Sequence, residues 1–163
     1  MGQPKGGTMP HSSVHIFVHI VWITKYFHRL LFGDTALRVK AHIEENAATK
    51  QIKLIASNVQ PEHVHVLTEL GRSQCIDDIV QLMKGESSHW INEHNLLRRH
   101  FTCQRGYWAA SVDRNGVFPV KSYIKGQDEH HMKFSFREEY AELLRASGYT
   151  EEEIKLYLLE LGQ

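Results

Sequence analysis

Hydrophobic residues alternate with polar ones in several short stretches of the chain. In residues 14–22 every second position is Val, Ile or Trp, and the same spacing returns in residues 52–56 and 64–68. Alternation is typical of strands, because successive side chains point to opposite faces of a sheet. We therefore expect strands in these three stretches, and a fourth in residues 107–112.

Hydrophobic residues three or four positions apart predict helices in the segments between strands. The clearest pattern covers residues 76–91, with Ser73 as a candidate cap at its start. A looser pattern predicts a helix from Asp34 to about residue 50, and a turn at residues 115–116 leads into a third helix. Helices therefore separate the first strand from the second, and the third strand from the fourth.

Two short helices are expected at the C-terminal end. Ser135 with Glu138, and Thr150 with Glu153, have the spacing of a capping box, in which each side chain binds the other residue's backbone N–H. These helices form an extension that begins near residue 134.

The predicted order of elements is strand, helix, strand, strand, helix, strand, helix, followed by the extension. This order is that of a ferredoxin-like split βαβ fold, an α+β sandwich with a four-stranded antiparallel sheet and helices on one face. The other face would stay open for function or for pairing with a second chain. We expect one domain in residues 14–163, preceded by a disordered leader or tag remnant in residues 1–13.

The charges balance over the chain but not along it. The 163 residues include 19 Lys and Arg, 19 Asp and Glu, and 12 His, which excludes a polybasic coat for nucleic acid. Residues 1–127 carry 15 basic and 10 acidic side chains, whereas residues 128–163 carry 4 and 9. We expect the acidic terminal helices either to face away from a DNA path or to compete with it.

The two cysteines and the longest apolar stretch indicate the compartment. Cys75 and Cys103 are too far apart for a metal knuckle and too few for a disulfide-rich secreted fold. Residues 14–24 are too few to span a bilayer, and they include two histidines. These features predict a cytoplasmic protein with no membrane partner.

Two histidines stand out in the third predicted strand. His63 and His65 are two residues apart, so both project to one side of the strand while Val64 and Val66 enter the core. Two imidazoles on one side can bind one metal ion. A pair with this spacing also arises by chance in a histidine-rich chain, and the alternative is two histidines on a solvated strand face.

Tyr123 and Gln127 lie four residues apart on a predicted helix and therefore on one face of it. A Gln carbonyl oxygen can join two imidazoles in a metal site, and a phenol can act as a nucleophile. The alternative is a half-buried aromatic side chain beside a solvated amide. Four other histidines are expected at the surface, namely His94, His100, His130 and His131.

Taken in order, these residues resemble the single-tyrosine transposases of bacterial insertion sequences, which belong to the HUH endonuclease superfamily and include the REP-associated tyrosine transposases. The resemblance covers nearly the whole chain after the leader. Its landmarks lie in residues 19–26, 61–67, 82–85, 106–107, 123–131 and 135–140.

The resemblance implies a homodimer that acts on single-stranded DNA and recognises hairpins at element ends. By position, His63 and His65 correspond to the metal-binding pair, Gln127 to the third ligand, and Tyr123 to the nucleophile, which the family suggests reaches the partner's histidines. Such nitrogen and oxygen donors suit Mg²⁺ or Mn²⁺. The expected enzyme is a metal-dependent transposase that cleaves and rejoins single-stranded DNA through a covalent 5′-phosphotyrosine intermediate.

DNA binding needs basic contacts to phosphates and aromatic contacts to unpaired bases. The basic candidates are Lys84, Arg98, Arg99, Arg105, Lys121 and Lys125, and the stacking candidates are Trp22, Tyr26, Tyr107 and Trp108. Two other functions stay open: a module that binds DNA or RNA hairpins without cleaving them, and a metal-dependent hydrolase in which Tyr123 is incidental.

Overall fold

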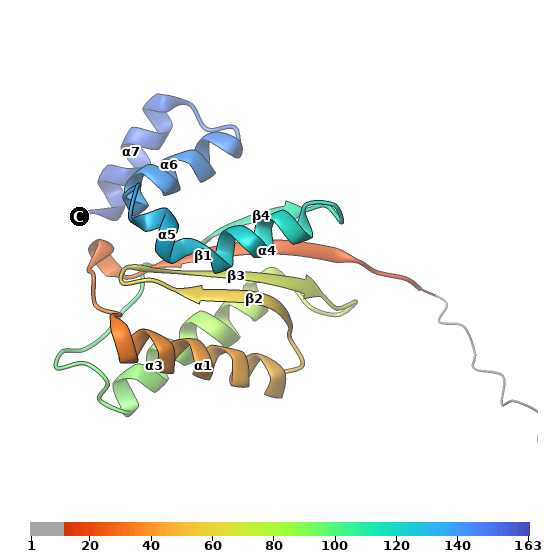
Figure 1. Ribbon diagram of the computed structural model, residues 1–163, viewed down its shortest axis with the longest axis horizontal. Helices are drawn as coiled ribbons and strands as arrows, with labels where there is room; N and C mark the ends of the chain where they lie inside the picture. Colours follow the sequence, from red (N-terminus) through yellow and green to blue (C-terminus); the bar gives the residue numbers. More distant parts are fainter. Residues whose placement is uncertain (1–11) are drawn as a thin grey trace, which may run out of the picture.

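A computed structural model describes residues 12–163 of the chain (Figure 1), so most of the expected leader lies outside the described residues. Four antiparallel strands form one sheet in the order β2-β3-β1-β4, and all four expected strands are present. This is the predicted ferredoxin-like strand order. The strands are β1 (Ile16–Ile23), β2 (Lys53–Val59), β3 (His63–Leu70) and β4 (Trp108–Val112).

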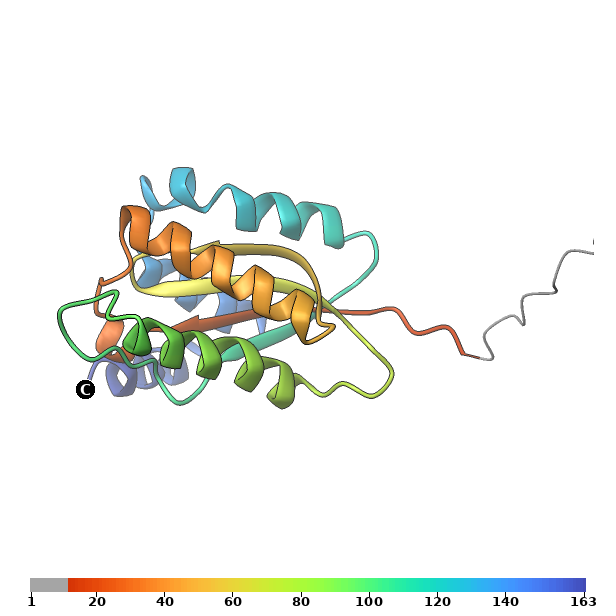
Figure 2. The same ribbon diagram turned by 90° about the horizontal axis from the view of Figure 1, so that it is seen from below.

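One face of the sheet packs on two helical segments and forms the main hydrophobic core. Helix α1 (Gly33–Thr49) and helix α3 (Glu86–Glu93) lie side by side across this face (Figure 2). Alternate residues of β1, such as Val18 and Ile20, point into this core and contact the buried residues of both helices. The alternation in the sequence therefore identifies the core face of β1 correctly.

The long helix expected after β3 is interrupted. It consists of α2 (Ile76–Val80), a π-helical segment η2 (Gln81–Gly85) and then α3. The expected Ser73 cap is wrong, because the helix begins after Cys75, whose Sγ accepts a hydrogen bond from the Asp78 backbone N–H. The periodicity thus predicts the helix but neither its cap nor its π-turn.

The second face of the sheet is covered as well, contrary to the expectation that it stays open. Helix α4 (Val117–Lys125) and helix α5 (Gln127–His131) lie on this face (Figure 1). Ile124 of α4 is fully buried and packs with Ala56 and Leu67 of the sheet. The third predicted helix therefore closes the face that we expected to be free.

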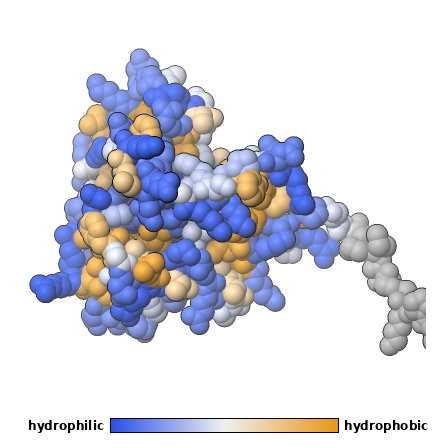
Figure 3. Space-filling model, viewed as in Figure 1, coloured by the Kyte–Doolittle hydropathy of each residue, from blue (hydrophilic) through white to orange (hydrophobic). Residues whose placement is uncertain are grey.

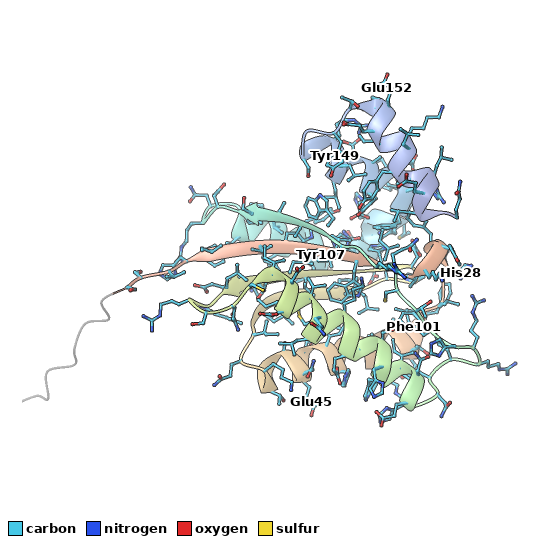
Figure 4. All side chains as sticks on the ribbon, turned by 180° about the vertical axis from the view of Figure 1, so that it is seen from behind. His28, Glu45, Phe101, Tyr107, Tyr149 and Glu152 are labelled. Atoms are coloured by element: carbon cyan, nitrogen blue, oxygen red, sulfur yellow. The ribbon has the colours of Figure 1, made fainter. Side chains whose placement is uncertain are left out.

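The C-terminal extension continues this second layer. Both predicted capping boxes are present, and they open α6 (Phe136–Ala146) and α7 (Glu151–Leu161). Phe136 and Tyr140 of α6 form a small core with strand residues such as Val21. The turn that joins the two helices, marked by Tyr149 in Figure 4, projects away from the sheet.

The surface seen in Figure 3 is mostly hydrophilic, with hydrophobic side chains in small scattered groups. Within residues 12–163, every helix is too short or too polar to cross a membrane.

Candidate active site

The two histidines of β3 are buried between the sheet and the C-terminal helices. His63 and His65 both have 0% exposure, while Val64 and Val66 point into the core on the opposite face. Phe136 of α6 stacks on His63, with ring centroids 3.7 Å apart and an interplanar angle of 12°. The alternative of a solvated strand face is therefore wrong.

A third histidine, His19 of the neighbouring strand β1, orients His65. Its Nε2 lies 2.9 Å from Nδ1 of His65, and the two rings are stacked. This contact leaves Nε2 of His65 as the nitrogen that faces the site. For Nε2 to bind a cation, the ring proton must sit on Nδ1, where His19 Nε2 can accept it.

Burial keeps these imidazoles neutral. Burial, and then the neighbouring His65, lower the pKa of His19 to about 3. Burial also lowers the pKa of His63 and of His65. The neutral form of imidazole is the one that binds metals.

Tyr123 and Gln127 reach the site from two helices rather than one. The helix breaks at Gly126, so Tyr123 lies in the last turn of α4 and Gln127 begins α5. Their side chains nevertheless meet: the Tyr123 hydroxyl and the Gln127 amide, the latter at 3.0 Å, both donate hydrogen bonds to Oε1 of Glu139. The structure thus brings together the four residues that the sequence singled out.

Glu139 of α6 lies at the centre of this site and was not among the predicted residues. It is 4% exposed, and its carboxylate lies 3.1 Å from Nε2 of His65 and 2.9 Å from Nε2 of His131. Burial by itself would raise the pKa of Glu139, but the close contacts with His131 and His65 outweigh burial and lower it. The carboxylate is therefore ionised at neutral pH.

Two histidines that we expected at the surface line the site instead. Nε2 of His131 lies 3.2 Å from Nε2 of His63, and the His130 ring meets the Tyr123 ring edge to face at 5.6 Å. The surface prediction is wrong for this pair. It is confirmed for His94 and His100, which are exposed.

The Tyr123 phenol is held in its protonated form. Burial, and then the hydrogen bond to the Glu139 carboxylate, raise its pKa well above the usual value of 10. A nucleophilic phenolate therefore needs a nearby positive charge to stabilise it.

The residues present fit a divalent cation. One ligand atom each from His63, His65 and Glu139 lie within 4.8 Å of one another. Several buried polar atoms around them have no hydrogen-bond partner among residues 12–163, which is costly unless another group binds them. These atoms are His63 Nδ1, His65 Nε2, Gln127 Oε1, His130 Nε2 and Glu139 Oε2.

The six basic candidates for DNA binding do not form one patch. Lys121 and Lys125 lie on α4, the helix that carries Tyr123. Lys84 lies on the other face of the sheet, where its Nζ donates hydrogen bonds to the carbonyls of Arg105 and Gly106. Arg98 and Arg99 are exposed in the loop after α3. Their DNA contacts stay a prediction.

The four aromatic candidates for stacking on bases also differ from one another in location and exposure. Trp22 is 2% exposed and belongs to the main core, so the expectation that it stacks on bases is wrong. Tyr26 is 39% exposed in the short helical turn η1 (Lys25–Phe27). Tyr107 and Trp108 are half-buried, and each donates a side-chain hydrogen bond within the chain. Tyr26 is thus the most accessible of the four.

Residues 12–127 match the family described as "Transposase IS200 like". The chain belongs to the family of IS200-like transposases. A curated relative, the ISDra2 transposase TnpA of Deinococcus radiodurans, is 36% identical in an alignment 116 positions long that covers 68% of this chain and 83% of the relative. The resemblance inferred from the sequence motifs is therefore confirmed.

Two solved structures share the fold of this IS200-like transposase. One is a crystal structure of a protein from Deinococcus radiodurans assigned as a transposase, with a TM-score of 0.60, 23% identity and coverage of 74% of this chain and 97% of that one. The other is a REP-associated tyrosine transposase bound to a REP hairpin, with a TM-score of 0.55, 16% identity and coverage of 80% and 74%.

The family match ends at Gln127, so Glu139 and His131 of this transposase lie beyond it. The sequence still holds a signal for Glu139. Phe136, Glu139 and Tyr140 share one face of α6, because residues three and four positions apart are neighbours on a helix. A carboxylate between two large aromatic residues on the buried face of an amphipathic helix indicates a site.

Proposed function

We propose that this chain is a metal-dependent transposase that cleaves and rejoins single-stranded DNA at hairpin-bearing ends through a covalent 5′-phosphotyrosine intermediate on Tyr123. The observation that carries the proposal is the convergence of Tyr123, Gln127 and His65 on the Glu139 carboxylate. A phenol held beside two neutral imidazoles and a carboxylate suits nucleophilic attack near a cation better than simple binding does.

The chemical step follows from the contacts of the phenol. Tyr123 Oη attacks the scissile phosphorus, the bond from phosphorus to the 3′ oxygen breaks, and a free 3′-hydroxyl leaves. The phenol proton passes to Oε1 of Glu139, to which the hydroxyl already donates a hydrogen bond, and a proton from solvent water protonates the leaving 3′ oxygen. One phosphodiester replaces another, so a second DNA end can reverse the step, which favours strand transfer over hydrolysis.

His63, His65 and Gln127 would hold the cation, which we propose to be Mg²⁺ or Mn²⁺. When bound, such an ion polarises the scissile phosphate and offsets the charge that grows during in-line displacement. The chain's own residues keep the imidazoles neutral and hold the phenol in place. Without the ion, the raised pKa of Tyr123 keeps the phenol protonated and unreactive.

The DNA partner is proposed by analogy and by charge. A REP-associated tyrosine transposase that shares the fold has been solved with a hairpin bound. In this chain, Lys121 and Lys125 lie on the same helix as Tyr123 and are the best placed of the basic candidates to contact phosphates.

A denaturing gel tests the proposed reaction. Incubation of the protein with hairpin-bearing single-stranded DNA and Mn²⁺ should give a covalent protein–DNA band, and both Tyr123→Phe and a chelator should abolish it. Tyr149→Phe, which removes an exposed phenol from the turn between α6 and α7, is the matched control and should keep the band. Cleavage without an adduct would instead support a hydrolase, and binding of intact DNA alone would support the non-cleaving module.

The same assay tests which chain of a homodimer supplies the nucleophile. Tyr123 lies beside the histidines of its own chain, with its ring 5.7 Å from that of His65. We therefore propose that Tyr123 acts in cis, also within a homodimer. A mixture of Tyr123→Phe and His63→Ala proteins should then form no adduct, whereas adduct formation would mean that the tyrosine acts on the partner's histidines.

A further inference from the structure

The acidic C-terminal segment contributes one carboxylate, that of Glu139, to the site. Glu139 lies 12 residues beyond Gln127, where the family match ends, and belongs to the extension formed by α6 and α7. We propose that Glu139 is a ligand of the divalent cation, so that metal binding fastens α6 over the two histidines of β3. The inference rests on the proposed metal-dependent function.

The two oxygens of Glu139 face different groups. Oε1 accepts the hydrogen bonds of Tyr123 and Gln127. Oε2 is buried and makes no hydrogen bond within residues 12–163, and it lies 2.9 Å from Nε2 of His131 and 4.0 Å from Nε2 of His63. One oxygen therefore holds the nucleophile and the amide, while the other faces histidine nitrogens and could bind a cation held by the two strand histidines.

The surroundings of Glu139 lack a fixed positive charge. Among residues 12–163, the ion-pair partners of this carboxylate are all histidines, namely His63, His65, His130 and His131. Burying a carboxylate costs several kcal/mol unless a full charge or good hydrogen bonds compensate. The hydrogen bonds of Tyr123 and Gln127 and the contacts with His65 and His131 compensate part of this cost, and a divalent cation would add a full positive charge.

Contacts made by the residues before and after Glu139 in α6 fix the position of its side chain. The Ser135 capping box sets the first turn of the helix, and Phe136 stacks on the metal-binding His63. Tyr140, directly after Glu139, is 1% exposed. A carboxylate on a helix held in this way needs little further ordering to bind an ion, which raises its affinity.

The donor set that results suits a hard cation. Two imidazole nitrogens, the Gln127 carbonyl oxygen and the Glu139 carboxylate make a site of mixed nitrogen and oxygen donors, which Mn²⁺ accepts readily. Replacing the carboxylate by a neutral amide of the same shape removes the negative charge and leaves the packing in place.

The test measures Mn²⁺ binding to the full chain without DNA, by titration calorimetry or by the electron paramagnetic resonance signal of free Mn²⁺. We expect Glu139→Gln to weaken binding at least about tenfold. Glu142→Gln, an exposed carboxylate one turn later on the same helix, is the control and should bind like the wild type. Glu139→Asp, which keeps the charge, should lose less affinity than Glu139→Gln.

Hydrogen exchange gives a second readout. Mn²⁺ should slow amide exchange in residues 136–146 of the wild type and not in Glu139→Gln, because only the wild type couples the ion to α6. Metal-free melting of each variant shows that it is folded. Unchanged Mn²⁺ affinity in Glu139→Gln would show that Glu139 is not a ligand and would leave the proposed metal dependence standing. Absence of Mn²⁺ binding in the wild type would contradict both proposals.

Discussion

The two faces of one sheet differ completely in chemistry although the same strands build them. On the face covered by α1 and α3, β1 and β3 contribute mostly hydrophobic side chains such as Ile20 and Val66, and the one buried hydroxyl, of Thr68, donates a hydrogen bond to the Lys53 carbonyl. On the face covered by α4 to α6, the alternate positions of the same strands carry His19, His63 and His65, all buried. The first face carries the main hydrophobic core, whereas the second combines smaller hydrophobic clusters with buried polar groups at a cost that a function explains.

The largest effect should come from the apolar face. Ile20→Ala removes a fully buried side chain from the main core, so we expect a loss of about 2 to 5 kcal/mol in the free energy of unfolding. Urea denaturation measures it. Ile16→Ala, on the same side of β1 but 50% exposed, should cost less than about 0.5 kcal/mol.

The comparison between the faces requires that Ile20→Ala leave the active site intact. Mn²⁺ affinity of the folded variant should therefore equal that of the wild type. A loss of affinity as large as that of Glu139→Gln would mean that the two faces are not independent.

The polar face should make stability depend on pH when no metal is present. His19 has a pKa of about 3 in the folded chain and about 6.5 when unfolded, so between these values the unfolded chain binds one more proton. The contribution of His19 to the free energy of unfolding is therefore fully present above about pH 6.5. As the pH drops below this value, the free energy of unfolding falls by about 1.4 kcal/mol per pH unit because of this residue. The lowered pKa values of His63 and His65 act in the same direction.

Urea denaturation with a chelator, at pH values between about 7 and about 5, checks this dependence. His19→Gln should flatten the slope, because it removes one of the groups that the unfolded chain protonates. If His19→Gln keeps the full slope of the wild type, His19 is not buried in its neutral form.

The smallest effect concerns the helix that carries Glu139. Ser135→Ala removes the side chain that caps α6, and Thr150→Ala removes the equivalent one from α7. Each should cost about 1 kcal/mol of stability, measured by denaturation. Only Ser135→Ala should also weaken Mn²⁺ binding, since α7 supplies no residue to the site. Equal Mn²⁺ affinities in the two variants would mean that the cap of α6 does not affect metal binding at the site.

The sequence predicts the parts of this molecule that depend on local spacing. Alternation locates the strands and separates Val64 and Val66 from His63 and His65, and the capping-box spacing locates α6 and α7. These patterns succeed because a strand face or a helix start is determined by residues within a few positions of one another.

The parts that sequence reasoning misses depend on contacts between distant segments. Whether His63 faces water or a closed site is decided by Phe136, 73 residues later, which stacks on it. Glu139 and His131 become site residues only because α5 and α6 fold over β3. Spacing along the chain gives no measure of such packing, so the expectation of an open sheet face is wrong for the same reason.

The place of Glu139 in the chain also has a consequence for synthesis. His65 precedes it by 74 residues, since the two stand at positions 65 and 139. At a translation rate of roughly 5 to 20 residues per second, the histidine pair exists for roughly 4 to 15 seconds before the carboxylate that covers it is made. In the nascent chain the histidine pair is thus exposed until α6 has been translated, and the site can be completed only near the end of synthesis.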